Sequence, residues 1–480
     1  MSLGLPSKSI TPVNNAPWLS LIWLILVTAT AGLLFSFVGL TFETPNSVNG
    51  VIPLFVVVSS FGLVLWAAKD LRQFRNLRQW FFLLFLIRLL IAINHHHLYW
   101  ADGKALFDRG LTQYDAFRYD ASAFEVVKYG WQDAQITVDQ WGIVAFYTII
   151  YGVFGHNPLF PILFNTLLGA LTSVFVYKIA LPATTAHVAG WSALATMVSP
   201  ETVFYGGVLM KEMLVMFLFF GTLWIWQRFQ TKRSWLNLVM FGLCLYALRE
   251  TRLSHLIIIL GVVALSMIKY WRFALKRIIP FAALGLFIVF IATTGQSNFV
   301  RGANVFSLDY LLARRVALDD AASQLAANKA EPSASIGLRL VVDPTVPATY
   351  VFIPFRVLTF YLVPPFWMWG TEPDFMPYQE IGSLLVWLGF PAVMWGMWQL
   401  IKKKQTMLWL AFALSTLVIS VATPFADARL KVAILPLFYL VAMIGFSQFH
   451  RWRQLYIPYG VAIILMAISY YTLKGVLGAM

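Results

Sequence analysis

The stretch PLFPILFNTLLGALTSVFVYKIA, residues 158–180, decides the fold class, because it carries only one charged side chain, Lys178. A helix rises 1.5 Å per residue, so a run of this length crosses the roughly 30 Å hydrocarbon core of a bilayer. Of the 480 residues in the chain, 60% are hydrophobic and 12% are charged. Similar apolar runs recur along the sequence, without the period-two alternation of barrel strands. The sequence therefore predicts an all-α, polytopic integral membrane protein.

The formal charge of +14 does not point to a nucleic-acid partner, because the basic residues stand in short clusters between apolar runs. Such clusters are typical of cytoplasmic loops. The segment 99–140 is different, with seven acidic residues against four basic ones, and we place it outside the membrane. The clusters that we place in the cytoplasm are 69–78, 228–233, 269–277, 402–404 and 450–453.

Thirteen candidate spans satisfy this placement, with the amino end inside and the carboxyl end outside. Two further apolar stretches would break the charge rule as spans, and we expect both to lie on the outer surface. The charged segment 297–348 has apolar residues at helical spacing and is predicted to contain a surface helix. The spans are 18–40, 51–68, 79–98, 158–180, 184–203, 206–227, 235–251, 253–270, 279–296, 381–400, 406–423, 431–448 and 455–475; the surface stretches are 141–155 and 350–370.

We divide the chain into a two-helix extension, residues 1–78, and one membrane domain, residues 79–480, with outer loops 99–157 and 297–380. The run 18–40 is longer than a signal-peptide core and is expected to remain as the first helix. The single cysteine, Cys244, lies in an apolar run. It is predicted to have a packing role.

The segment QYDAFRYDASAF, residues 113–124, follows one of these spans and holds two carboxylates, Asp115 and Asp120. Carboxylates at a boundary of water and lipid can serve as a general base, as metal ligands or as solvated charges. Both are candidate catalytic residues. A divalent cation is a possible cofactor, and the sequence does not identify one.

The spacing Asp115-x-x-x-Tyr119-x-x-x-Ala123 resembles a pattern in the first large outer loop of the GT-C superfamily of membrane glycosyltransferases. The resemblance is greatest to the branch that contains the lipid A aminoarabinose transferase and the protein O-mannosyltransferases. Three later segments support the resemblance, in the same order as in the family, and extend it to roughly residues 79–450. They are YTIIYGVFGHNPLFPILFNTLLGALTSVFVYKIA, ALATMVSPETVFYGGVLMKEMLVMFL and PFADARLKVAILPLFYL.

This resemblance implies a GT-C-like fold and a donor sugar carried on a polyprenyl phosphate. It implies inverting transfer to a lipid, glycan or protein acceptor, with Asp115 as the base and Asp120 as the second candidate. Two features depart from the family: two spans precede the one that leads into the acidic loop, and ITVDQWGIVAF stands where relatives have a basic residue before paired prolines.

A phosphate donor needs cations near the acids, because negative charge collects on the leaving phosphate. Candidate phosphate-binding residues at the outer ends of spans are Lys211, Arg249, Arg252, Arg429 and Lys431. Basic residues at span ends also commonly extend to lipid head groups, which is the alternative for each. Basic residues on the outer side run against the charge bias, and for this reason we favour Arg249, Arg252 and Arg429.

Three other polar residues are candidates for the site. Glu201 and Glu212 lie in or beside apolar runs, where ionisable groups are usually paired, so a structural ion pair is as well supported as acceptor or metal binding. His97 ends a run of three histidines. Adjacent histidines on a helix point in different directions and form a poor metal chelate, whereas a hydrogen bond to phosphate remains open.

The sequence thus predicts a glycosyltransferase of the cytoplasmic (inner) membrane, with its site on the outer, periplasmic side and membrane lipids around it. One alternative is a polymerase or ligase of lipid-linked glycans, with its chemistry in the loop 297–348. Another is a flippase or transporter of lipid-linked sugars, which would place charges near the bilayer midplane and often shows two similar halves.

Overall fold

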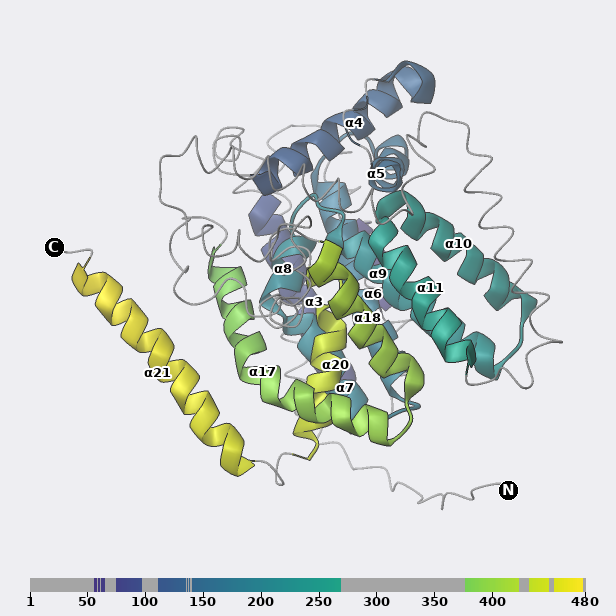
Figure 1. Cartoon of the computed structure of the whole chain (residues 1–480). Coiled ribbons are helices and arrows are strands. Elements are labelled where there is room, and N and C mark those ends of the chain that lie inside the picture. Colours follow the sequence, from purple (N-terminus) through teal and green to yellow (C-terminus); the bar gives the residue numbers. More distant parts are fainter. Residues whose placement is uncertain are drawn as a thin grey trace, which may run out of the picture. The chain divides into compact units, whose positions relative to one another are not determined.

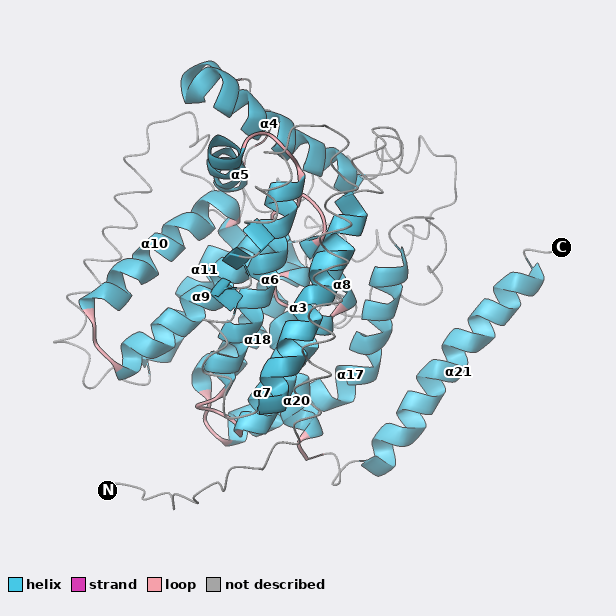
Figure 2. Ribbon diagram, turned by 180° about the vertical axis from the view of Figure 1, so that it is seen from behind, coloured by secondary structure: helices cyan, strands magenta, loops and turns pink. Residues whose placement is uncertain are grey.

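A computed structural model of the chain describes residues 56–57, 59–60, 62–64, 75–96, 111–134, 136, 138, 140–268, 376–422, 431–448 and 453–477. All of them belong to one compact unit, Phe55–Met480. Regular structure in this part of the chain is helical throughout, which confirms the all-α class (Figures 1 and 2). The predicted elements 18–40, 279–296, 297–348 and 350–370 lie outside the described residues.

The helices follow the order of the apolar runs in the sequence. They are α3 (Arg75–His96), α4 (Leu111–Asp133), α5 (Trp141–Phe154), α6 (Leu159–Ala180), α7 (Ala186–Val198), α8 (Pro200–Gly206), α9 (Glu212–Thr231), α10 (Trp235–Thr251), α11 (Leu253–Ile268), α17 (Met376–Lys402), α18 (Thr406–Ala422), α20 (Leu435–Phe446) and α21 (Arg453–Leu477).

Helix α6 forms the centre of the packed bundle. It is buried on nearly every side and contacts α3, α5, α7, α8 and α9. Helices α10 and α11 pack beside α9, while α17 and α20 form a second close pair (Figure 1). A helix that is apolar on all faces suits the interior of a membrane bundle, which is where the stretch that decides the fold class is placed.

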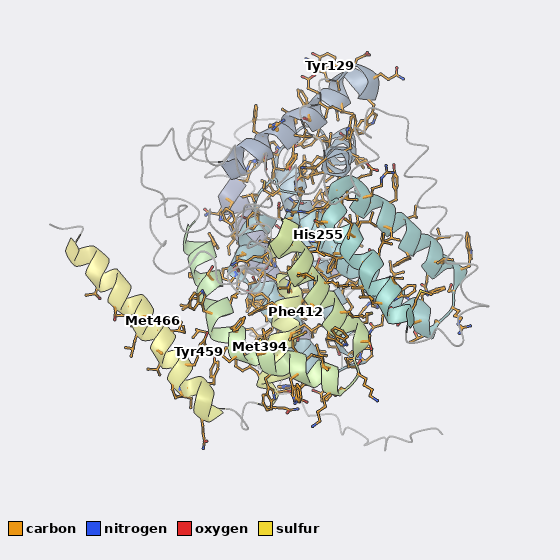
Figure 3. The ribbon with its side chains drawn as sticks, viewed as in Figure 1. Tyr129, His255, Met394, Phe412, Tyr459 and Met466 are labelled. Carbon is orange, nitrogen blue, oxygen red and sulfur yellow. The ribbon has the colours of Figure 1, made fainter. Side chains whose placement is uncertain are left out.

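Three helical stretches are long and apolar enough to cross a membrane: Leu77–His96, Leu159–Ala180 and Ile381–Lys402. The described residues also contain shorter apolar helices, among them α5 and α20. Apolar side chains such as Met394 and Met466 are exposed on α17 and α21 (Figure 3), as expected where a helix faces lipid. A helical membrane protein is therefore supported, and the number of thirteen spans stays a prediction.

The predicted span 184–203 is not one helix, which corrects the sequence interpretation. Helix α7 ends at Val198, Ser199 is extended with ψ of 121°, and the short helix α8 begins at Pro200. A residue before proline avoids the helical region, and proline itself has no N–H to continue the ladder. The following helix, α9, accordingly starts at Glu212 rather than at the predicted residue 206.

The acid-bearing segment forms α4, which is interrupted by Gly130 with φ of 79°. The stretch 141–155, predicted as a surface helix, forms α5, and α4 packs against it. These two helices, together with the turn after α5, position the candidate site.

Candidate functional site

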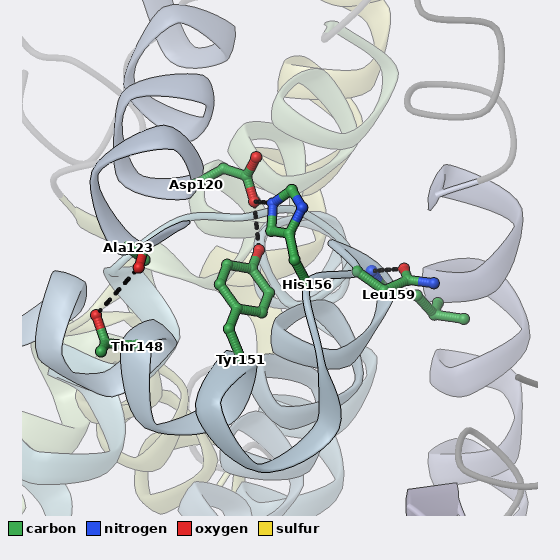
Figure 4. A network of polar contacts seen from close by, with 7 residues as sticks. Asp120, Ala123, Thr148, Tyr151, His156 and Leu159 are labelled. Atoms are coloured by element: carbon green, nitrogen blue, oxygen red, sulfur yellow. Dashed lines mark hydrogen bonds and ion pairs between the residues drawn. The ribbon is translucent and has the colours of Figure 1, made fainter. Parts of the chain in front are cut away.

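Asp120 is the buried carboxylate of α4, and two side chains from outside α4 hold it. Tyr151 of α5 donates its hydroxyl hydrogen to Asp120 Oδ1, and His156 Nε2 lies 3.3 Å from the same oxygen (Figure 4). Thr148 adds a hydrogen bond of 3.5 Å to the carbonyl oxygen of Ala123, which joins the two helices at the next turn. The Asp120 side chain is therefore fixed in one place.

The turn after α5 brings His156 under α4. Gly155 ends the helix with φ of +85°, a left-handed conformation that suits glycine. Asn157 then accepts a hydrogen bond of 2.9 Å from the backbone N–H of Leu159 as α6 begins. The imidazole of His156 packs against the rings of Phe124, at 4.1 Å between centroids, and Tyr151, at 4.8 Å.

Burial raises the pKa of Tyr151, and the neighbouring negative charge of Asp120 raises it further. The phenol therefore stays protonated at physiological pH and remains a hydrogen-bond donor to the carboxylate. The pKa of Tyr147, one turn earlier on α5, is also raised by burial. Neither tyrosine is suited to act as a base here.

A lysine approaches the residue next to Asp120. Tyr119 donates a hydrogen bond of 2.5 Å to Gln140 Oε1, and Lys211 Nζ lies 2.6 Å from the same oxygen. The ammonium group also lies 5.8 Å from the centre of the Tyr119 ring. Gln140 thus connects α4 to the start of α9, where Lys211 stands.

An ion pair follows directly after Lys211. Glu212 is almost fully buried, and its Oε1 lies 3.6 Å from Arg252 Nη1, at the corner between α10 and α11. Asn165 of α6 supports this region by donating hydrogen bonds of 2.9 Å to the carbonyl of Val208 and 3.1 Å to that of Met210. We call Tyr119, Asp120, Gln140, Tyr151, His156, Lys211, Glu212 and Arg252 the α4 cluster.

The two predicted catalytic carboxylates do not form a pair. Five residues along a helix correspond to a rotation of about 140°, so Asp115 and Asp120 face different directions. Asp115 is partly exposed, whereas Asp120 is buried. Of the two, Asp120 is the one that belongs to the α4 cluster.

The predicted phosphate-binding residues do not all lie in the α4 cluster. Lys211 and Arg252 belong to the α4 cluster, whereas Arg249 lies 3.6 Å from the carboxylate of its neighbour Glu250. Arg429 and His97 lie outside the described residues. His95, two residues before His97, is buried, and its Nε2 lies 3.2 Å from the hydroxyl oxygen of Tyr378. It is not in the α4 cluster.

Lys431 and Glu201 form a separate buried group, where sequence interpretation had placed Lys431 among the phosphate-binding residues. Their charged atoms lie 4.0 Å apart, and neither side chain is accessible to solvent. Lys431 also donates to Ser383 at 3.3 Å, and Ser199 donates to Glu201 at 3.1 Å. A lysine in an apolar interior needs a countercharge, and Glu201 at the α7–α8 break provides it.

Sequence reasoning missed Tyr151, His156, Gln140 and Arg88. His156 lies in the turn between the apolar helices α5 and α6, and a polar ring at such a place is a usable signal. Arg88 is a lone cation inside an apolar run. It is buried and donates to the carbonyls of Met197, at 3.2 Å, and Thr202, at 2.5 Å, so it satisfies backbone groups on both sides of the α7–α8 break.

Among the described residues, no group of three or more His, Cys, Asp and Glu side chains is arranged to hold a metal ion. In comparisons with known proteins, no family model matches the chain and no curated protein is similar to it. The α4 cluster is thus interpreted from its own geometry: a fixed carboxylate, a partly exposed imidazole and two cations from distant parts of the sequence.

Proposed function

We propose that the protein is a membrane glycosyltransferase of the GT-C type, which moves a sugar from a polyprenyl-phosphate donor to an acceptor at the outer face of the cytoplasmic membrane. The observation that carries this proposal is the α4 cluster. It combines the fixed carboxylate of Asp120 with the cations Lys211 and Arg252.

The negative carboxylate and the positive side chains suit the two halves of a glycosyl transfer. The acceptor must lose a proton as its oxygen or nitrogen attacks the anomeric carbon, and a carboxylate centre supports that loss. The phosphate that leaves the sugar gains negative charge, and fixed cations stabilise it in the transition state. In this account Lys211 and Arg252 bind the donor phosphate, and Asp120 belongs to the acceptor-activating centre.

Arg252 is partly neutralised by Glu212, from which it is 3.6 Å away. This contact holds the guanidinium in position, and a guanidinium group is chemically suited to bind a phosphate. Arg249 and Arg429 remain candidates for the same role. The acceptor is a lipid, a glycan or a protein.

The test is transfer of radiolabelled sugar from a panel of polyprenyl-phosphate sugars in membranes that contain the wild type, Asp120→Asn or Asp115→Asn at equal abundance. We expect transfer by the wild type and a loss of at least about 100-fold in Asp120→Asn. A loss confined to Asp115→Asn would instead make Asp115 the base. An inactive wild type across the panel would refute the proposal.

A transporter of lipid-linked sugars is the second candidate, because Arg88 and the Glu201–Lys431 pair are buried beside a broken helix. Transporters often place ionisable groups at such breaks. In that case Glu201→Gln would abolish movement of a labelled lipid across vesicles, while Asp120→Asn would not affect it.

A further inference from the structure

His156 contacts the buried carboxylate of Asp120 and is itself partly exposed to solvent. Its side chain is 33% exposed, against 10% for the side chain of Asp120. The ring is also held on two sides, by Phe124 and by Tyr151. The imidazole is thus both held in place and accessible, whereas the carboxylate is held in place and largely covered. Figure 4 shows the contact between them.

The contact to Asp120 sets the tautomer of this histidine. Because the carboxylate accepts from Nε2, the proton of the neutral ring belongs on Nε2, and the lone pair is left on Nδ1. Nδ1 makes no hydrogen bond to another described side chain. The same division of work, with a buried carboxylate orienting a histidine that handles protons, operates in hydrolytic triads.

The phenol of Tyr151 completes the arrangement. It donates to the same carboxylate oxygen that faces the imidazole. Asp120 is therefore held from two directions, which fixes its position relative to the ring.

We propose that His156 takes the proton from the acceptor and that Asp120 and Tyr151 are positioning residues that orient it. This proposal rests on the proposed glycosyl transfer. As the acceptor hydroxyl oxygen forms a bond to the anomeric carbon, the bond from that carbon to the phosphate oxygen breaks. The electron pair leaves with the polyprenyl phosphate, the acceptor proton moves to Nδ1 of His156, and water later removes it.

The first experiment compares His156→Ala with His156→Gln in the transfer assay, each with and without added imidazole. We expect both variants to lose about 100-fold or more of the transfer rate, because a positioned base contributes on that scale. Free imidazole should restore the rate of His156→Ala at least about tenfold by filling the vacated space as a base. It should not restore His156→Gln, whose side chain fills that space.

Glutamine keeps an N–H donor for Asp120 but cannot take up a proton. His156→Gln therefore separates the hydrogen bond to Asp120 from the uptake of the acceptor proton. Full activity of His156→Gln would overturn the proposal, because a purely structural hydrogen bond would then suffice. The control is His187→Ala, which removes an exposed histidine of α7 that lies against Trp191, away from the α4 cluster in sequence. We expect it to transfer sugar normally and to show no response to imidazole.

A second measurement does not depend on transfer. Diethyl pyrocarbonate acylates unprotonated imidazole nitrogens, and its reaction with each histidine can be followed by peptide mass spectrometry in the intact protein. We expect His156 to react readily, buried His255 to be protected, and Asp120→Asn to slow the reaction of His156 about threefold or more, because the contact with the carboxylate orients the ring and leaves the lone pair on Nδ1.

If His156 is acylated at the same rate in the wild type and in Asp120→Asn, the coupling of the two residues is refuted, whether or not the protein transfers sugar. If the wild type transfers no sugar while the labelling shows the coupling, the proposed function fails and the Asp120–His156 pair stands. The two failures are therefore distinguishable.

Discussion

The ion pair between Glu201 and Lys431 predicts a large loss of stability when either partner is removed alone. The charged atoms lie 4.0 Å apart, and both side chains are inaccessible to solvent. At an effective dielectric constant of about 20, two unit charges at this distance attract each other by about 4 kcal/mol. Loss of one partner also leaves the other charge buried and uncompensated, at a total cost of about 3–5 kcal/mol.

The perturbation is a double-mutant cycle with Glu201→Gln, Lys431→Met and the combination of both. We expect each single variant to lose about 3–5 kcal/mol of unfolding free energy. The double variant, with no buried charge left in the pair, should be more stable than the sum of the single losses predicts by about 2–3 kcal/mol. Unfolding is measured by tryptophan fluorescence in mixed detergent micelles with increasing amounts of a denaturing detergent.

The matched control is Lys403→Met, which removes an exposed lysine after α17 and should change the unfolding free energy by less than about 0.5 kcal/mol. Additive losses in the cycle, within about 0.5 kcal/mol, would refute the reasoning, because they would mean that the two residues do not interact.

Three further predictions concern neighbouring contacts. In Gly382→Ala the new Cβ would lie 2.0 Å from the carboxylate of Glu201, so the protein should lose stability in the same unfolding assay. Tyr151→Phe removes a donor to Asp120 and should lower transfer about tenfold without affecting the yield of folded protein, as size-exclusion chromatography would show. Arg88→Met leaves two carbonyls at the α7–α8 break without their donor, at a cost of about 1–3 kcal/mol each, which should lower the midpoint temperature of thermal unfolding. For each of the three variants, an unchanged value in its assay would contradict the contact concerned.

The fold class follows from sequence because the length of an apolar run and the need to satisfy backbone hydrogen bonds in lipid leave few choices. The acid-bearing segment 99–140 was placed outside the membrane from its charge, and its residues Leu111–Asp133 form α4. The break at Ser199 was missed because hydrophobicity continues across it. Pro200 carried the signal, and the sequence interpretation gave hydrophobicity more weight than the backbone restriction before proline.

The site was less accessible from sequence, because its contacts join residues that are far apart in the chain. Asp120 was among the predicted carboxylates, yet its contact to His156 depends on the turn at Gly155 and on the packing of α4 against α5. Lys431 looked like a cation at the end of a span. Only tertiary packing places it against Glu201.

The most direct test of the central claim is the rate of sugar transfer from polyprenyl-phosphate donors by purified wild-type protein in lipid vesicles, compared with Asp120→Asn. The account predicts transfer by the wild type and a loss of at least about 100-fold in the variant, with the same folded yield. Equal transfer by both proteins would remove Asp120 from the reaction centre, and no transfer by the wild type from any donor would contradict the assignment as a glycosyltransferase.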